Sequence, residues 1–276
     1  GTAEMRNLLG GKGANQALAA RRAGADVAMI GAVGADTQAG EALALLNDGG
    51  VDLSGLAESA LQTACAFIGV DGGGENQIIV ASGANLDARA AQLAALGLGP
   101  GDVLLLQMEV THAENWNAVE IAKAAGARVV LNLAPAGAVP PEVLRRIDVL
   151  IVNETEARQL AAQLALPESV PAEIGARLAA DFVEHCIVTL GSSGVSSYGV
   201  AGTHHLPALA VEVVDTTAAG DAFVGGFAAA LQAGAEMEAC LAQGVVTGGL
   251  ACRKLGAQSS LPARAEIAAA LVEFRA

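Results

Sequence analysis

Aromatic residues are scarce in this sequence and make up only 3% of its 276 residues. An interior packed mainly from aromatic rings is therefore excluded, and the core must be built from Ala, Val, Leu and Ile. Hydrophobic residues nevertheless amount to 53% of the chain. This is enough for one large domain, or for one domain with a small appendage. We expect a single domain over residues 1–276.

Basic residues are also few. The chain has 15 Lys and Arg against 29 Asp and Glu, which gives a formal net charge of −14. A surface that binds nucleic acid needs a basic patch, and so does a surface that docks on anionic lipids. Both partners are therefore disfavoured. A phosphate ligand remains compatible with this charge, because helix N-termini and a few local cations can bind it.

Cysteine pairs and long apolar runs are missing as well. Four scattered cysteines, none in a C-x-x-C pair, indicate neither a disulfide framework nor a zinc site and favour a reducing cytoplasm. No apolar run is long enough to span a bilayer, and no basic start followed by an apolar stretch marks a signal peptide. We expect a cytoplasmic protein without a membrane partner.

What the sequence does contain is an alternation of strand-like and helix-like segments. Runs such as 103–106 and 149–152 are apolar throughout, which is typical of parallel strands covered on both faces. The alternation predicts an α/β fold, a doubly wound and mostly parallel sheet with helices on both faces. Strands are expected at 26–33, 102–110, 128–133, 148–152 and 186–190, and helices at 10–22, 39–46, 112–125, 141–147, 154–164, 172–184, 220–253 and 263–274.

One region departs from this alternation. Residues 64–70 and 76–81 are strand-like and flank a glycine-rich turn at 71–75, and the residues before Gly10 offer another short strand. We expect a small β appendage from about 1–9 and 64–81. Such a piece acts as a lid or as a dimer surface, and a plain edge hairpin is the alternative.

The most informative stretch is the segment 214–223. A strand-like run at 210–214 leads into Asp215, a turn of small residues and an apolar helical run. The N–H groups that open a helix have no partner inside it and lie at the positive end of its dipole, so they suit a phosphate. Asp221 lies at the same helix start and is a candidate base beside that anion. The alternative is an ordinary helix cap after a turn.

A second glycine-rich segment, residues 10–16 (GGKGANQ), opens a helix near the N-terminus. Its spacing fits neither a P-loop nor a dinucleotide fingerprint. Lys12 and Asn15 are three residues apart and therefore share one helix face. Donors of this kind suit a polyhydroxylated ligand, and a turn with a solvated lysine is the alternative.

Further polar residues follow predicted strands, where open α/β sheets bind their ligands. Asn153 and Glu156 are placed to hold magnesium through water, or simply to cap a helix. The loop 189–194 is suited to a nucleotide phosphate, or merely makes a turn. Glu109 ends the strand-like run 103–108, where a carboxylate accepts hydrogen bonds from sugar hydroxyls or is simply exposed.

Together these segments resemble the PfkB family of carbohydrate kinases, and within it the ribokinases. Residues 10–16 are similar to the family's sugar-binding signature. Residues 215–221 (DTTAAGD) are similar to its C-terminal signature DTxGAGD, of which the AAGD form is typical of ribokinases. Residues 153–156 match its NxxE motif. The resemblance covers essentially the whole chain, since further ribokinase-like segments lie at 107–109, 132–135 and 253–258.

The resemblance implies ATP-dependent phosphorylation of D-ribose to ribose 5-phosphate. Asp221 would be the catalytic base that takes the proton from the primary hydroxyl of the sugar. The N–H groups of Ala219, Gly220 and Asp221 would form an anion hole for the transferred phosphoryl group, whose transfer depends on positioning and charge stabilisation. The sugar would be bound by Gly11, Lys12, Asn15, Glu109 and Asp221.

It also implies sites for ATP, Mg²⁺ and K⁺. The hairpin at 65–81 would be part of a lid that closes on ribose and pairs with a second subunit, which predicts a homodimer. Glu156 would hold Mg²⁺ through water. The expected ATP contacts are Asn153, Thr189, Leu190, Gly191, Ser192, Ser193, Gly194 and Gly220, and the expected K⁺ site consists of Asp215, Thr217, Ala251, Lys254, Gly256 and Ser260.

One feature of ribokinases has no counterpart here. They carry an N-terminal strand with an N-x-D motif before the GGKGAN segment, whereas only nine residues precede Gly10. We therefore expect the first core strand and one sugar ligand to be missing, with a sheet edge left open. Two alternatives remain: another PfkB sugar or nucleoside kinase, such as a fructokinase or adenosine kinase, and a truncated, inactive nucleotide-binding fragment. An oxidoreductase is disfavoured, because no dinucleotide fingerprint follows the first strand.

Overall fold

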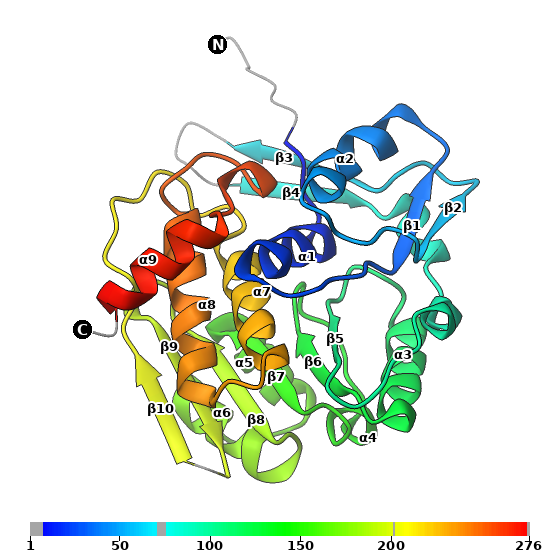
Figure 1. The fold of residues 1–276 in the computed structure, drawn as a ribbon. Coiled ribbons are helices and arrows are strands. Elements are labelled where there is room, and N and C mark those ends of the chain that lie inside the picture. Colours follow the sequence, from blue (N-terminus) through cyan, green and yellow to red (C-terminus); the bar gives the residue numbers. More distant parts are fainter. Residues whose placement is uncertain (1–7, 71–75, 201, 275–276) are drawn as a thin grey trace.

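The computed structural model describes residues 8–70, 76–200 and 202–274 and confirms the α/β architecture (Figure 1). The main sheet of this described part has six strands in the order β10-β9-β8-β7-β6-β5. Neighbours from β5 to β8 pair in parallel, and β9 and β10 extend the sheet antiparallel. The strands are β5 (Val103–Leu106), β6 (Arg128–Asn132), β7 (Val149–Asn153), β8 (His185–Thr189), β9 (Val195–Gly199) and β10 (Gly202–Leu206).

The apolar strands contribute to two cores at once. On β6, Val129 and Leu131 pack with α3, α5 and α6, whereas Val130 belongs to the cluster formed with α7 and α8. Successive side chains of a strand point to opposite faces, so a strand that is apolar throughout needs helices on both sides. The predicted two-sided cover is therefore confirmed. These helices are α3 (His112–Ala125), α5 (Glu154–Gln163), α6 (Pro171–Asp181), α7 (Ala219–Gln232) and α8 (Met237–Ala251).

The glycine-rich N-terminal segment forms helix α1 (Lys12–Ala23), which packs against α7. The contact is made by small side chains, among them Ala19 of α1 and Ala222 of α7. The first turns of these two helices therefore lie close together, although their sequences are about 200 residues apart. The remaining helices are α2 (Thr37–Asp48), the short α4 (Pro141–Leu144) and α9 (Arg264–Phe274). Among the described helices, none is long and apolar enough to cross a bilayer.

Two small sheets lie outside the main one. β1 (Gly31–Gly34) pairs in parallel with β2 (Leu56–Ser59), and β3 (Cys65–Val70) pairs antiparallel with β4 (Asn76–Ala81). The two strands expected near 64–81 are thereby confirmed. Their connecting turn at 71–75 and most of the expected strand before Gly10 lie outside the described residues, and Leu8 and Leu9 form no regular element.

Several local predictions were wrong. The run 210–214 is not a strand: the N–H of Val214 donates to the carbonyl of Cys252 after α8, so the segment is tied to a helix end and not to a neighbouring strand. The strand expected at 26–33 is reduced to an isolated bridge at Ala28 and to β1. The region 220–253 is mostly helical as predicted, but it contains two helices, because a turn at Gly234 with a φ of 76° separates α7 from α8.

Three strands were not predicted at all. β2, β9 and β10 are short and contain no long apolar run, and β9 and β10 are rich in Ser, Gly, Thr and His. Their strand conformation depends on neighbours that are already extended: β9 pairs with β8, and β10 pairs with β9. Strand propensity is strongly dependent on such context.

Candidate active site

Polar residues gather where the parallel strands of the main sheet end. Asn132, Asn153 and Thr189 are the last residues of β6, β7 and β8, and Gln107 and Glu109 follow β5. Open α/β sheets bind ligands at this edge, because the carboxyl ends of the strands and the N-termini of helices meet there. The structure thus brings segments that are far apart in the sequence to one edge.

Asp221 lies in the first turn of α7 and is buried. Nδ2 of Asn15 donates a hydrogen bond of 2.8 Å to its Oδ2, and Nε2 of Gln16 donates one of 2.9 Å to its Oδ1. Hydrogen bonds to a carboxylate are charge-assisted and stronger than those between neutral groups. The carboxylate of Asp221 is therefore held from both oxygen atoms by the first turns of α1.

The start of α7 presents free N–H groups beside this carboxylate. Ala218 precedes the helix in the left-handed conformation, with a φ of 58°, and the N–H of Ala219 donates to the carbonyl of Thr216. Among the described residues, the N–H groups of Gly220 and Asp221 have no acceptor. A Cβ placed on Gly220 would meet nothing within 4 Å. The helix start therefore offers two unpaired donors toward open space, which suits an anion.

The start of α1 lies against Glu109. Gly11 precedes the helix with a φ of 103°, a conformation that favours glycine. The N–H of Lys12 then donates a hydrogen bond of 2.8 Å to Oε2 of Glu109. Burial raises the pKa of Glu109, the hydrogen bond and charge of Lys12 oppose this, and the charge of Asp221 adds to the rise. Lys12, Glu109 and Asp221 are thus close enough to influence one another electrostatically.

Asn15 carries an unused acceptor. Its side chain is 5% exposed, and its Nδ2 is bonded to Asp221, but its Oδ1 is buried without a partner among the described residues. Buried polar atoms are nearly always paired, and an unpaired one calls for an explanation. A ligand hydroxyl that donates to Oδ1 would satisfy it. The position of this atom next to Asp221 therefore suits a ligand that carries a hydroxyl group.

The pair Asn153 and Glu156 forms a reciprocal cap of α5. The N–H of Glu156 donates to Oδ1 of Asn153, and the N–H of Asn153 donates to Oε2 of Glu156, both at 2.8 Å. The alternative of a helix cap is thus observed. Burial raises the pKa of Glu156, and the charges of Lys12 and Asp221 also act on it. The cap therefore lies within the electrostatic reach of the Asp221 site.

The loop from Thr189 to Gly194 makes a tight turn after β8. Gly191 and Gly194 have φ values of 57° and 94°, and the N–H of Leu190 donates to the carbonyl of Gly194. Ser192 and its neighbours are exposed. The expected turn is observed, and its exposed backbone faces the same edge of the sheet as Asn153, since Asn153 and Thr189 are paired in register.

Asp215 connects two loops near α7. Its Oδ1 accepts from the N–H and the hydroxyl of Thr217, and its Oδ2 accepts from the N–H of Gly256 at 2.8 Å. Burial acts to raise the pKa of Asp215, but these hydrogen bonds outweigh it and hold the pKa below its usual value. Lys254 directs its ammonium group to Glu266. Within the described ranges, no group of three or more His, Cys, Asp or Glu residues is arranged to hold a metal ion.

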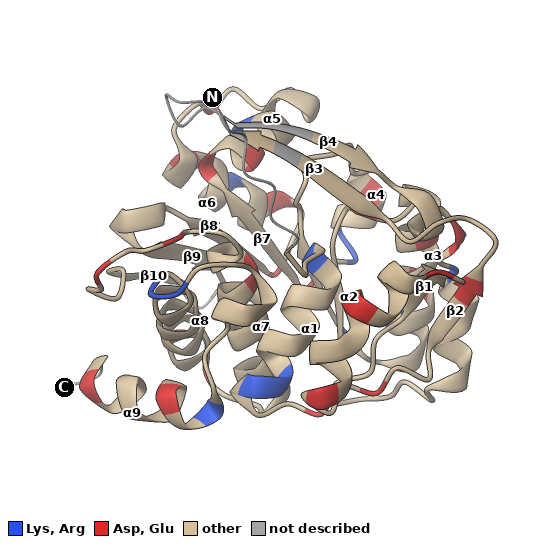
Figure 2. Ribbon diagram, turned by 90° about the horizontal axis from the view of Figure 1, so that it is seen from above, with Lys and Arg blue, Asp and Glu red and all other residues tan. Residues whose placement is uncertain are grey.

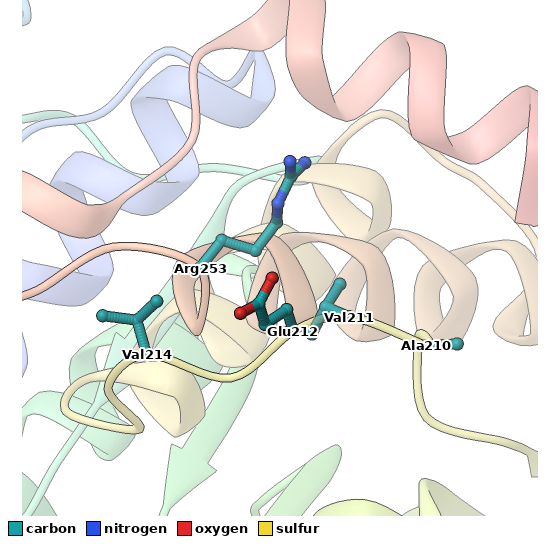
Figure 3. Close-up of a pocket in the computed structure, with 5 residues that line it drawn as sticks. All are labelled: Ala210, Val211, Glu212, Val214 and Arg253. Carbon is teal, nitrogen blue, oxygen red and sulfur yellow. The ribbon is translucent and has the colours of Figure 1, made fainter.

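A cavity of about 410 Å³ lies beside this loop. Figure 3 shows the Arg253 guanidinium above the Glu212 carboxylate in this space. The lining residues include none of the Asp221 cluster, so this cavity is not the centre of the site. They are Ala210, Val211, Glu212, Val214 and Arg253.

Few basic residues lie near the acidic side chains of the site. Basic positions are few and scattered in the view from above (Figure 2), in keeping with the net charge of −14. Lys12 is the cation whose charge reaches both Glu109 and Glu156. An anionic ligand here would depend on Lys12, on helix N-termini and on cations brought with it.

The family model described as "pfkB family carbohydrate kinase" matches residues 2–264. This chain belongs to the PfkB family. A ribokinase of Haemophilus influenzae is 36% identical over 260 residues, which cover 93% of this chain and 85% of that relative. As a PfkB kinase, the protein is an enzyme that transfers a phosphoryl group.

Solved structures of PfkB relatives agree with the fold. A ribokinase from Thermotoga maritima has a TM-score of 0.86 at 32% identity, with 96% of this chain and 87% of that one covered. A ribokinase from Arabidopsis thaliana, solved with ribose and ATP, also has a TM-score of 0.86, at 29% identity, with 98% and 90% covered. The ribokinase-like α/β fold predicted from the sequence is thereby confirmed.

Some residues of this site in the PfkB kinase were predicted from the sequence, and others were not. Lys12, Asn15, Glu109 and Asp221 were expected to share a site, and the structure brings them together. No role was assigned to the amides of Gln16, Gln107 and Asn132. Gln16 is hydrogen-bonded to both of the others and to Asp221. The available signal was a glutamine next to Asn15 on a helix whose neighbours are almost all Ala and Leu.

Proposed function

We propose that this PfkB kinase phosphorylates D-ribose at its primary hydroxyl with ATP, forming ribose 5-phosphate and ADP. The observation that carries the proposal is the buried Asp221 carboxylate, oriented by Asn15 and Gln16 beside the free N–H groups that open α7. The relatives named above support the choice of ribose and ATP as substrates.

In this reaction Asp221 accepts the proton of the sugar's primary hydroxyl. The hydroxyl oxygen forms a bond to the γ-phosphorus of ATP, and the bond from that phosphorus to the bridging oxygen breaks, so that ADP leaves with the electron pair. The free N–H groups of Gly220 and Asp221 stabilise the negative charge of the transferred group. The N–H of Ala219, the third expected donor, would first have to leave the carbonyl of Thr216.

The sugar lies between the start of α1 and the segment after β5. Gly11, Lys12, Asn15 and Glu109 surround the position where a hydroxyl would approach Asp221, and the unpaired Oδ1 of Asn15 accepts one sugar hydroxyl. A site built to hydrogen-bond hydroxyl groups discriminates well against analogues that lack them, because its own polar atoms would stay unpaired.

ATP would contact Asn153, Gly220 and the loop from Thr189 to Gly194. Mg²⁺ fits the donor chemistry here, because it is commonly held by one carboxylate together with waters and substrate phosphates. Glu156 would be that carboxylate, and the ion would neutralise charge on the phosphates.

A K⁺ ion would be bound near Asp215 and Thr217, with Ala251, Lys254, Gly256 and Ser260 around it. The acceptor oxygens of a carboxylate and of loop carbonyls suit such a cation. The ammonium group of Lys254 is paired with Glu266, so its positive charge is directed elsewhere and would not oppose the ion.

The pair β3–β4 would act as a lid and as the contact with a second copy. Phe67 and Ile79 are register partners on one face of the pair and are 64% and 63% exposed, and Val80 on the other face is 59% exposed. Apolar side chains this exposed favour a partner surface when they are contiguous. We therefore propose a homodimer formed through this pair.

The test is a substrate panel with the purified chain. ATP-dependent ADP release would be measured with D-ribose, D-fructose and adenosine, each with Mg²⁺ and with either K⁺ or Na⁺. Ribose should give the highest kcat/KM, and K⁺ should raise it above Na⁺. A preference for fructose or adenosine would transfer the assignment to a sister kinase, and ATP binding without transfer to any acceptor would identify an inactive nucleotide-binding chain.

A further inference from the structure

We propose that Gln16 is a positioning residue that holds Asp221 in the orientation needed to accept the substrate proton. This rests on the proposed function, in which Asp221 is the base. Gln16 does not touch the substrate in this proposal. It acts through Asp221, as the member of a chain of side-chain amides that donates to the carboxylate of Asp221.

The chain begins at Gln107, in the segment after β5. Nε2 of Gln107 donates a hydrogen bond of 2.6 Å to Oε1 of Gln16. Nε2 of Gln16 then donates to two acceptors, Oδ1 of Asn132 and Oδ1 of Asp221, both at 2.9 Å. The primary amide of Gln16 thus uses both N–H groups and its oxygen. It has no freedom to rotate without breaking a buried hydrogen bond.

A hydrogen bond of Asn132 to the backbone determines which amide atoms donate and which accept. Nδ2 of Asn132 donates to the carbonyl of Ile151, so its Oδ1 faces Gln16 as an acceptor. Gln16 must therefore present its nitrogen to Asn132 and to Asp221. A donor at this position matches an ionised Asp221, which has only acceptor atoms. The amide chain thus holds the carboxylate of Asp221 in one orientation and presents only a donor to its Oδ1.

The buried position of Gln16 indicates a role for its amide beyond filling space in the core. Its side chain is 0% exposed, on a helix whose other buried residues are mainly Ala and Leu. An apolar side chain would fill this volume without burying polar atoms, which have a desolvation cost. Asn15, the other donor to Asp221, is expected to contact the sugar as well. Gln16 is the donor that serves the protein side alone, so it continues to hold Asp221 while Asn15 engages the ligand.

Other charged groups lie around the same site as Asp221. Lys12 from α1, Glu109 after β5 and Glu156 from α5 share its electrostatic environment. They remain in place when Gln16 is changed. A shift in the pH profile that appears on changing Gln16 alone therefore reports on the lost amide.

The decisive variant is Gln16→Met, which keeps the length of the side chain and removes its hydrogen bonds. The matched control is Gln243→Met on α8, because its Nε2 bridges the carbonyl of Ala23 on α1 and that of Gly226 on α7. The control loosens the same helices without touching the site. For each variant, kcat and KM are measured against pH on the best acceptor of the substrate panel, with thermal unfolding as the check on folding.

Gln16→Met should lower kcat by about ten- to a hundredfold, the effect of a lost buried hydrogen bond to a charged group. The KM values for sugar and ATP should change by less than about threefold, since binding groups are untouched. The acid limb of the kcat profile should move to higher pH, and the control should keep the wild-type profile. A kcat and pH profile equal to those of Gln243→Met would overturn the proposal.

Two further measurements separate this proposal from the function on which it rests. Adding Gln16→Met to Asp221→Asn should cause no further loss, because Gln16 acts only through Asp221. If Asp221→Asn alone keeps its activity, the proposed function fails. If Asp221→Asn is inactive but Gln16→Met behaves as wild type, only the positioning role fails.

The proposal can also be tested if Gln16→Met does not fold or if no activity is found. If Gln16→Met does not fold, Gln107→Met removes the donor to Oε1 of Gln16 and should reproduce a weaker form of the same effects. Without any turnover, the side-chain amide protons of Gln16 can be followed by NMR. They should be protected from exchange and should shift in Asp221→Asn, and exchange as fast as that of an exposed glutamine would overturn the proposal.

Discussion

Gly225 of α7 lies directly against the backbone of Gln16 on α1. A Cβ on Gly225 would be 2.6 Å from the carbonyl oxygen of Gln16 and 2.8 Å from the N–H nitrogen of Ala20. The absence of a side chain at this position therefore sets how closely the two helices approach. Gly225 is one helical turn after Asp221, so the same contact sets the distance from Asp221 to its amide donors.

Gly225→Ala should consequently affect stability and turnover together. The added methyl group must push α1 away, and overpacking of this kind costs about 1–3 kcal/mol of unfolding free energy. Displacement of Gln16 from Asp221 should lower kcat by up to about a hundredfold. Chemical denaturation and steady-state kinetics measure the two effects.

The matched control is Gly40→Ala on α2, where a Cβ would meet nothing within 4 Å. This change should stabilise the protein by about 0.5–1 kcal/mol, because alanine is the better helix former. Equal effects of the two substitutions would show that the α1–α7 contact is not tight.

Asp221→Asn should abolish most of the turnover. The variant keeps the shape of the side chain but removes the group that accepts the proton, so kcat should fall roughly a hundred- to ten-thousand-fold. ATP affinity, measured by calorimetry, should change little. Asp26→Asn, at a surface ion pair with Arg21, serves as a control and should keep full activity. Near-normal turnover of Asp221→Asn would exclude it as the base.

Glu109 should make the protein less stable as the pH rises. Its folded pKa is raised above 4.5 by burial, so the folded state binds more protons than the unfolded state above that pH. The stability that Glu109 contributes is then fully present below pH 4.5 and is lost as the pH rises through its folded pKa. Glu109→Gln should weaken this decline in the unfolding temperature, while the oxygen of the new side-chain amide still accepts from the N–H of Lys12. An unchanged pH dependence would contradict the raised pKa.

The exposed face of the β3–β4 pair should control oligomeric state. Phe67→Asp places a charge where the proposed dimer buries an aromatic ring, and should raise the dimer Kd by at least about a hundredfold. Sedimentation velocity over a concentration series measures this. Val272→Asp on α9 replaces another side chain that is 73% exposed and should leave the assembly unchanged. A monomeric wild type would exclude the homodimer.

The sequence was sufficient where burial on both faces leaves little choice. The apolar runs of β6, β7 and β8 were predicted to within about one residue, because a strand covered by helices on both sides must be apolar throughout. The run 210–214 looked similar but has no strand beside it, and Val214 bonds to the end of α8 instead. β9 and β10 are strands although their sequences are polar, since β8 supplies the pairing. Pairing partners are a property of the assembled sheet and are not visible in a single segment.

For the site as well, some features could be predicted from the sequence and others only from the tertiary structure. The residue types were evident from the sequence: glycines at helix starts, a lysine and an asparagine on one face of α1, and an aspartate opening α7. Their resemblance to PfkB signatures was sufficient to name the family. What each side chain does to its neighbour was decided only by tertiary structure, because the donors to Asp221 come from more than 200 residues away. Gln16 shows this most clearly: its sequence position indicates a buried helix residue, and only the crossing of α1 and α7 at Gly225 turns its amide toward the carboxylate of Asp221.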